Sequence, residues 1–156
     1  MKKCLTAVFL MLAMLLLSGC GRLSAEDYRD ELKERWKDYL SAQLDIVHDI
    51  QTLDESGTLP PEFEEHCKSF EKAMKSFEMI KPPNGMDYEH SLLLEALENE
   101  REWLAAVRAL TSANTPEEIE QAEQRIMTAA SYENSFPQRY LEVIRALPSD
   151  TSYWTY

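Results

Sequence analysis

The sequence predicts an all-α domain, an up-down-up-down bundle of four helices whose last helix is kinked or broken near Pro137. Apolar residues recur at intervals of three and four residues in four successive segments, which is the period of a buried helix face. Proline and glycine separate these segments. Strand-like alternation of apolar and polar residues is absent from the sequence, and its 4 glycines are few for an all-β fold with many turns.

The first helix is expected to follow Ser24, which is a favoured N-cap residue. Its core-facing stripe repeats at intervals of four and three residues: Leu32, Trp36, Tyr39, Gln43, Ile46, Ile50 and Leu53. Leu40, Leu44 and Val47 widen this stripe, so we expect the helix to touch more than one neighbour. Gly57 ends it.

The second helix is expected to begin at Pro61, because proline is favoured in a first helical turn. Its glutamates lie near the N-terminus and its lysines near the C-terminus, as the helix dipole favours. Its apolar stripe consists of Phe63, Cys67, Phe70, Met74 and Phe77. The run Pro82-Pro83-Asn84-Gly85 predicts the next turn.

The third helix is expected from about Met86 to Ala113, with a stripe formed by Leu93, Leu97, Glu100, Leu104, Val107 and Thr111. Thr115-Pro116-Glu117-Glu118 then combines an N-cap, a proline at the first helical position and a capping box. It is the best helix start in the sequence. Pro137 should kink or break the fourth helix, and Pro148 should end its last segment.

The first 19 residues have the features of an export signal. Lys2 and Lys3 form a short positive region, and an apolar run follows from Leu5 to Leu17. A membrane-spanning helix needs about 20 apolar residues. The run is therefore too short to span a bilayer and is typical of a signal peptide.

Leu17-Ser18-Gly19-Cys20 resembles the lipobox of bacterial lipoproteins, which is a large aliphatic residue, two small residues and a cysteine. The resemblance implies a thioether-linked diacylglycerol on Cys20 and cleavage between Gly19 and Cys20. Two acyl chains give stable anchoring, where one gives reversible binding. Gly21, in place of aspartate, implies sorting to the outer membrane in a Gram-negative host. In a Gram-positive host the protein would stay on the outer leaflet of the cell membrane.

These motifs divide the chain into a signal peptide (1–19), a short tether (20–24), a helical domain (25–148) and a C-terminal tail (149–156). Of the 3 cysteines, Cys4 leaves with the signal and Cys20 takes the lipid. Cys67 remains alone and cannot form an intramolecular disulfide. We therefore expect a monomer whose fold is stabilised by its hydrophobic core.

Charge and motif content narrow the classes of function. Without Lys2 and Lys3 the chain has 14 basic and 28 acidic residues, a net charge of −14. Nucleic-acid binding is not expected of so acidic a chain, because phosphate contacts need clustered lysine and arginine. Motifs for a catalytic triad, a phosphate-binding loop or c-type haem attachment are missing. We expect a non-enzymatic interaction or accessory protein without a cofactor, whose partner is a protein at or near the membrane.

An envelope protein that binds copper or zinc is the alternative. The sequence contains two Pro-Pro pairs, and each is followed by an aromatic residue and then by Glu-His. The two histidines of this pattern, His66 and His90, are candidate metal ligands. Further candidates near them are Glu62, Cys67, Met74, Met79 and Met86. The spacing matches no strong metal motif, and antiparallel helices would hold His66 and His90 far apart. We expect both histidines to pack near helix starts and Cys67 to be a small buried hydrophobe.

Glu100 and Gln43 are the polar residues on core stripes. A carboxyl group in a core either pairs or has a raised pKa. Carboxylate-bridged metals in helical bundles use a Glu-x-x-His pattern, but Trp103 stands where that histidine would be. We therefore expect Glu100 to pair or to reach solvent at the edge of the bundle.

The net charge predicts that residues 21–156, without the lipid, do not bind anionic vesicles at physiological ionic strength. Like charges repel over a Debye length of about 8 Å under these conditions. Cosedimentation with anionic vesicles tests this, and vesicles of neutral lipid provide the baseline. Binding above that baseline would reveal a basic or amphipathic face.

Overall fold

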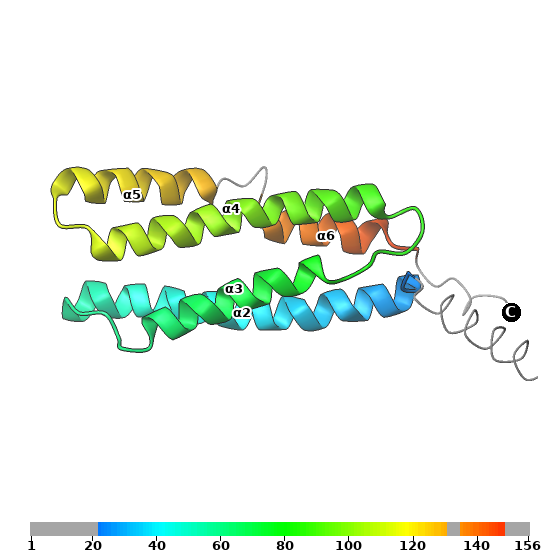
Figure 1. Cartoon of the computed structure of the whole chain (residues 1–156), viewed down its shortest axis with the longest axis horizontal. Coiled ribbons are helices and arrows are strands. Elements are labelled where there is room, and N and C mark those ends of the chain that lie inside the picture. The colour runs from blue at the N-terminus through cyan, green and yellow to red at the C-terminus, as the bar shows by residue number, and fades with distance from the viewer. Residues whose placement is uncertain (1–21, 131–134, 149–156) are drawn as a thin grey trace, which may run out of the picture.

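Five helices make up most of the described residues, which are 22–130 and 135–148 in this computed structural model (Figure 1). In chain order they are α2 (Ala25–Ser56), α3 (Phe63–Glu78), α4 (Asp87–Ser112), α5 (Pro116–Ala129) and α6 (Phe136–Ala146). The described ranges contain no strand, and the predicted all-α class is confirmed for them.

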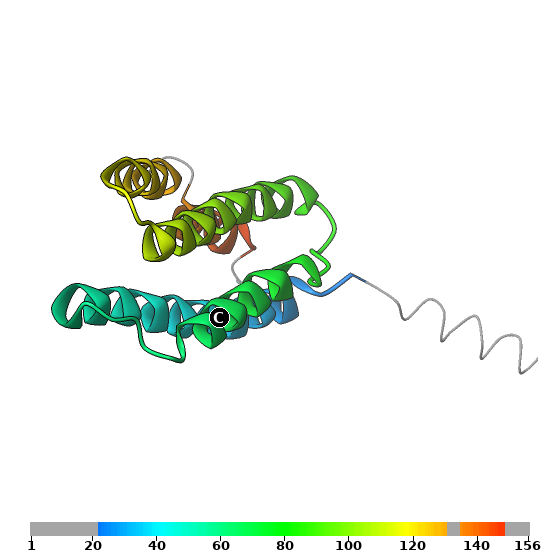
Figure 2. The same ribbon diagram turned by 60° about the vertical axis from the view of Figure 1, so that its left-hand side comes forward.

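Successive helices from α2 to α5 run in opposite directions along the long axis of the molecule (Figure 1). α2 packs on α3, while α5 and α6 both pack on α4 and run against it. Figure 2 shows α2 and α3 as one layer and the other three helices as a second. The segment expected to form one kinked or broken helix thus contains two helices, and Pro137 lies in the first turn of α6.

Helix ends follow local sequence signals. The Ser24 hydroxyl accepts a hydrogen bond from the Asp27 amide at 3.1 Å, as expected of an N-cap. Gly57, with φ of 72°, ends α2 in the left-handed conformation that glycine adopts without strain. Thr115 and Glu118 form the predicted capping box at the start of α5.

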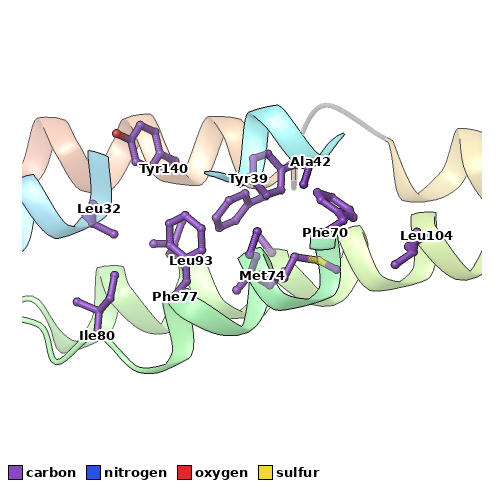
Figure 3. Close-up of a cluster of buried hydrophobic side chains, with 14 of the residues drawn as sticks. Leu32, Tyr39, Ala42, Phe70, Met74, Phe77, Ile80, Leu93, Leu104 and Tyr140 are labelled. Atoms are coloured by element: carbon purple, nitrogen blue, oxygen red, sulfur yellow. The ribbon is translucent and has the colours of Figure 1, made fainter. Parts of the chain in front are cut away.

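The core lies between the two layers and receives side chains from α2, α3, α4 and α6 (Figure 3). Its largest fully buried side chains are Tyr28, Tyr39, Phe70, Phe77 and Phe136. α5 contributes little, since Ala122 is its one buried residue and Ile126 packs at the edge of the core. Four of the five helices therefore build the core.

An aromatic cluster joins α6 to the opposite layer. The ring centroid of Phe136 lies 4.8 Å from that of Tyr39 in α2 and 4.9 Å from that of Phe77 in α3. Trp36 of α2 stacks on Tyr140 of α6, with ring centroids 4.2 Å apart. Such pairs add stability beyond the apolar area that they bury.

The prediction that α2 touches a second neighbour through its widened stripe is wrong for the residues named. Leu40, Leu44 and Val47 are 37%, 64% and 37% exposed. α2 does touch both α3 and α6, but it meets α6 through Trp36 and Tyr39. The residues that widen the stripe form an apolar surface instead.

We expect Phe136→Ala to lower the free energy of unfolding by about 3–5 kcal/mol, the usual effect of removing a buried phenylalanine ring. Leu141→Ala, on the same helix but 47% exposed, is the control and should lower it by about 1 kcal/mol or less. Urea unfolding followed by circular dichroism measures both. Equal losses would contradict the central position of Phe136.

Candidate functional site

The predicted lipidation site, Cys20 with Gly19 before the cleavage point, lies outside the described residues. The described part begins two residues later, where Arg22 Nη1 donates to Asp87 Oδ2 at 2.6 Å. Leu23 packs against the core. The last residues of the predicted tether are therefore attached to the domain near the start of α4.

His90 is buried in the first turn of α4 and hydrogen-bonded to α2. Its Nδ1 lies 2.7 Å from the Tyr28 hydroxyl, and the two rings meet edge to face. Burial lowers the pKa of His90, although Asp87 opposes this, and burial raises the pKa of Tyr28. Both groups are held neutral, so this contact is a structural link between α2 and α4.

His66, in the first turn of α3, makes the corresponding contact at the other end of α2. Its Nδ1 lies 2.7 Å from Oδ2 of Asp49, whose side chain is only 3% exposed. This hydrogen bond raises the pKa of His66, which favours the imidazolium. The protonated ring then compensates a carboxylate that would be costly to bury alone.

The two histidines are not brought together. Their partners Tyr28 and Asp49 lie 21 positions apart on α2, which is about 30 Å along a helix. Of the methionines proposed as ligands, Met74 and Met86 are buried and Met79 is exposed. In the described part of the chain, histidine, cysteine, aspartate and glutamate form no group of three or more able to hold a metal ion. Glu62 lies exposed at the N-cap of α3.

Cys67 is the small buried hydrophobe that the sequence predicts, and its thiol is free. Burial raises its pKa, while Arg108 nearby opposes the shift. A raised pKa disfavours the thiolate, which is the reactive form. The guanidinium of Arg108 is itself paired with Glu64 and Glu71 of α3.

Glu100 is 8% exposed and lies where α2, α4 and α6 meet. It accepts hydrogen bonds from the Tyr39 hydroxyl and from the backbone N–H of Phe136, and Tyr39 in turn accepts one from Gln43 at 3.1 Å. The expected pairing of Glu100 therefore occurs, inside the core. Burial raises the pKa of its carboxyl group more than these two hydrogen bonds lower it.

Sequence reasoning overlooked two residues of these contacts, Tyr28 and Asp49. Tyr28 precedes Leu32 by four residues and so extends the core stripe of α2. Asp49 follows Ile46 by three residues and precedes Leu53 by four. The helical period could have identified both as buried, but their partners lie on other helices.

Comparisons of this chain with protein-family models, curated proteins and solved structures found no match.

None of the helices within residues 22–130 and 135–148 has the length and apolar content that crossing a bilayer requires. The polar contacts described above link helices to one another as separate pairs and clusters.

Folding raises the pKa of the Glu100 carboxyl group. Protonated Glu100 therefore favours the folded state at pH values below the pKa that the group has in the unfolded chain. This contribution to the free energy of unfolding is lost as the pH rises through the pKa of the folded state. Glu100→Gln removes this titration. Relative to the wild type, the variant should therefore gain free energy of unfolding between about pH 4.5, the ordinary pKa of this group, and neutral pH.

Urea unfolding of both proteins at several pH values measures this difference. Glu95→Gln, at an exposed position of the same helix, is the control for removing one carboxyl group from α4. A difference between Glu100→Gln and wild type that stays constant with pH would contradict a raised pKa.

Proposed function

We propose that this protein is a lipid-anchored lipoprotein of the cell envelope, and that its helical domain is a non-enzymatic interaction module held at the membrane surface. The observation that carries the proposal is the sequence Leu17-Ser18-Gly19-Cys20 placed directly before a folded domain. A lipid on Cys20 would supply the anchor. The membrane concerned is the outer membrane or the cell membrane, on the side facing away from the cytoplasm.

We also propose that the domain is an up-down-up-down four-helix bundle whose last leg is divided into α5 and α6. The support is that α5 and α6 both pack on α4 and run antiparallel to it. α6 lies beside the N-terminal half of α4, and α5 lies beside its C-terminal half. The division gives the two segments different packing partners, since only α6 supplies several buried core residues.

The packing of Leu23 against the core, together with the contact of Arg22 with Asp87, places the start of the domain close to the anchor. Only Gly21 lies between Cys20 and Arg22, a span of about 7 Å at 3.3–3.6 Å per extended residue. The domain is therefore held close to the headgroups, and a protein partner is itself in the membrane or close to it. The net charge of −14 favours a basic surface on that partner.

The test is metabolic labelling with a fatty acid in a bacterial host. The wild type should incorporate label and be processed, whereas Cys20→Ala should stay unlabelled and unprocessed, because acylation needs the Cys20 thiol. Cys4→Ala is the matched control, since it removes a cysteine of the signal peptide outside the motif, and it should be labelled like the wild type.

Label in Cys20→Ala would disprove the anchor. Membrane retention alone does not decide the question, because an uncleaved signal peptide also associates with lipid. The label and the change in mass on cleavage are therefore the measurements that count.

A further inference from the structure

The outer face of α2 carries a stripe with the spacing of a helix-pairing surface. Its seven members follow one another at intervals of four and three residues, and all are exposed: Lys33, Lys37, Leu40, Leu44, Val47, Gln51 and Asp54. We call them the α2 stripe. A regular alternation of four and three is the repeat with which two helices pack side by side over several turns.

The centre of the α2 stripe is apolar and its two ends have opposite charge. Leu44, the middle residue, is 64% exposed, and Leu40 and Val47 on either side of it are each 37% exposed. Lysines occupy the N-terminal end and Asp54 the C-terminal end. When a second copy of the helix runs in the opposite direction, the lysine end of each copy faces the aspartate end of the other.

We propose that the α2 stripe is the surface by which two copies of this chain pair, with their α2 helices antiparallel about a two-fold axis. In such a pair each surface contacts the same surface of the partner, so every contact occurs twice. The pairing departs from the monomer expected from the sequence, and it does not depend on the proposed lipid anchor.

One register pairs six of the seven residues of the α2 stripe, and leaves Lys33 beyond the end of the second helix. With Leu44 opposite Val47 of the second copy, Leu40 lies against the aliphatic part of Gln51, and Lys37 lies opposite Asp54. The two-fold axis repeats each of these contacts, so apolar residues occupy the centre and an ion pair closes each end. The ion pairs favour the antiparallel orientation more than they add affinity.

A parallel arrangement is disfavoured by the same residues. It would place Lys33 and Lys37 opposite their own copies, and Asp54 opposite Asp54. In the structure Lys37 is paired with Glu34 at 2.6 Å, and Lys33 with Asp30 at 3.3 Å. These are exposed pairs within one helix and contribute little, so the lysines remain available to a partner.

The orientation has a consequence that rests on the proposed function. In this register the two Ala25 residues lie 41 helical positions apart, which is about 60 Å along the helix axis. Two copies anchored in one membrane would then lie with α2 parallel to its surface and the two-fold axis along the membrane normal.

The test is sedimentation equilibrium of residues 21–156, whose helices and core lie within the described residues. The apolar centre is small, so we expect a weak dimer that accumulates as the protein concentration approaches roughly 1 mM. Leu44→Glu should remain monomeric over that range. Met127→Glu, at a 68% exposed position of α5, is the matched control and should pair like the wild type.

Charge exchange tests the antiparallel register. Lys37→Glu alone and Asp54→Lys alone each replace two ion pairs per dimer with like charges, and each should lower the association constant about tenfold. The double variant restores opposite charges and should restore association. Circular dichroism checks that every variant keeps its helical content.

Three outcomes would overturn the proposal. The wild type could remain monomeric up to roughly 1 mM, which would leave the α2 stripe to another partner. Association unaffected by Leu44→Glu would assign pairing to another face. Failure of the double charge variant to recover association would exclude the antiparallel register. None of these results bears on the lipid anchor, which the labelling of Cys20 tests separately.

Discussion

The two layers of helices are held together around the first residue of α6. The ring of Phe136 is fully buried between Tyr39 of α2 and Phe77 of α3. Its backbone N–H donates to Glu100 of α4. One residue thus contacts every other helix of the core, and the position of α6 against α2 depends on it.

The buried carboxyl group of Glu100 is a consequence of this arrangement. The first N–H groups of a helix have no partner within the helix, and the Ser135 side chain makes no capping hydrogen bond to α6. Glu100 provides the missing acceptor from another helix. The same burial disfavours its ionised form, so the cap and the raised pKa have one physical origin.

The exposed stripe on α2 lies outside the contacts that this helix makes with α3 and α6. α6 meets α2 through Trp36 and the aromatic cluster, whereas α5 packs on α4 and adds one buried residue, Ala122. Leu40, Leu44 and Val47 therefore remain at the surface. A second copy of the chain, placed as we propose, would cover them in the way that a neighbouring helix covers the equivalent residues of a core stripe.

The sequence by itself determined the all-α class, the ends of α2, the start of α5 and which helix faces are apolar, because caps, prolines and the helical period act over a few neighbouring residues. It did not show that the last segment forms two helices, or that α3 begins at Phe63 and not at Pro61. It also carries the motif at Cys20, which remains a prediction. Only the tertiary structure decided that Asp49 pairs with His66, that Glu100 caps α6, and that Leu44 is exposed. The physical reason is that the period of a helix shows which side chains share a face, while the burial and partners of that face depend on residues of other helices, far away along the chain.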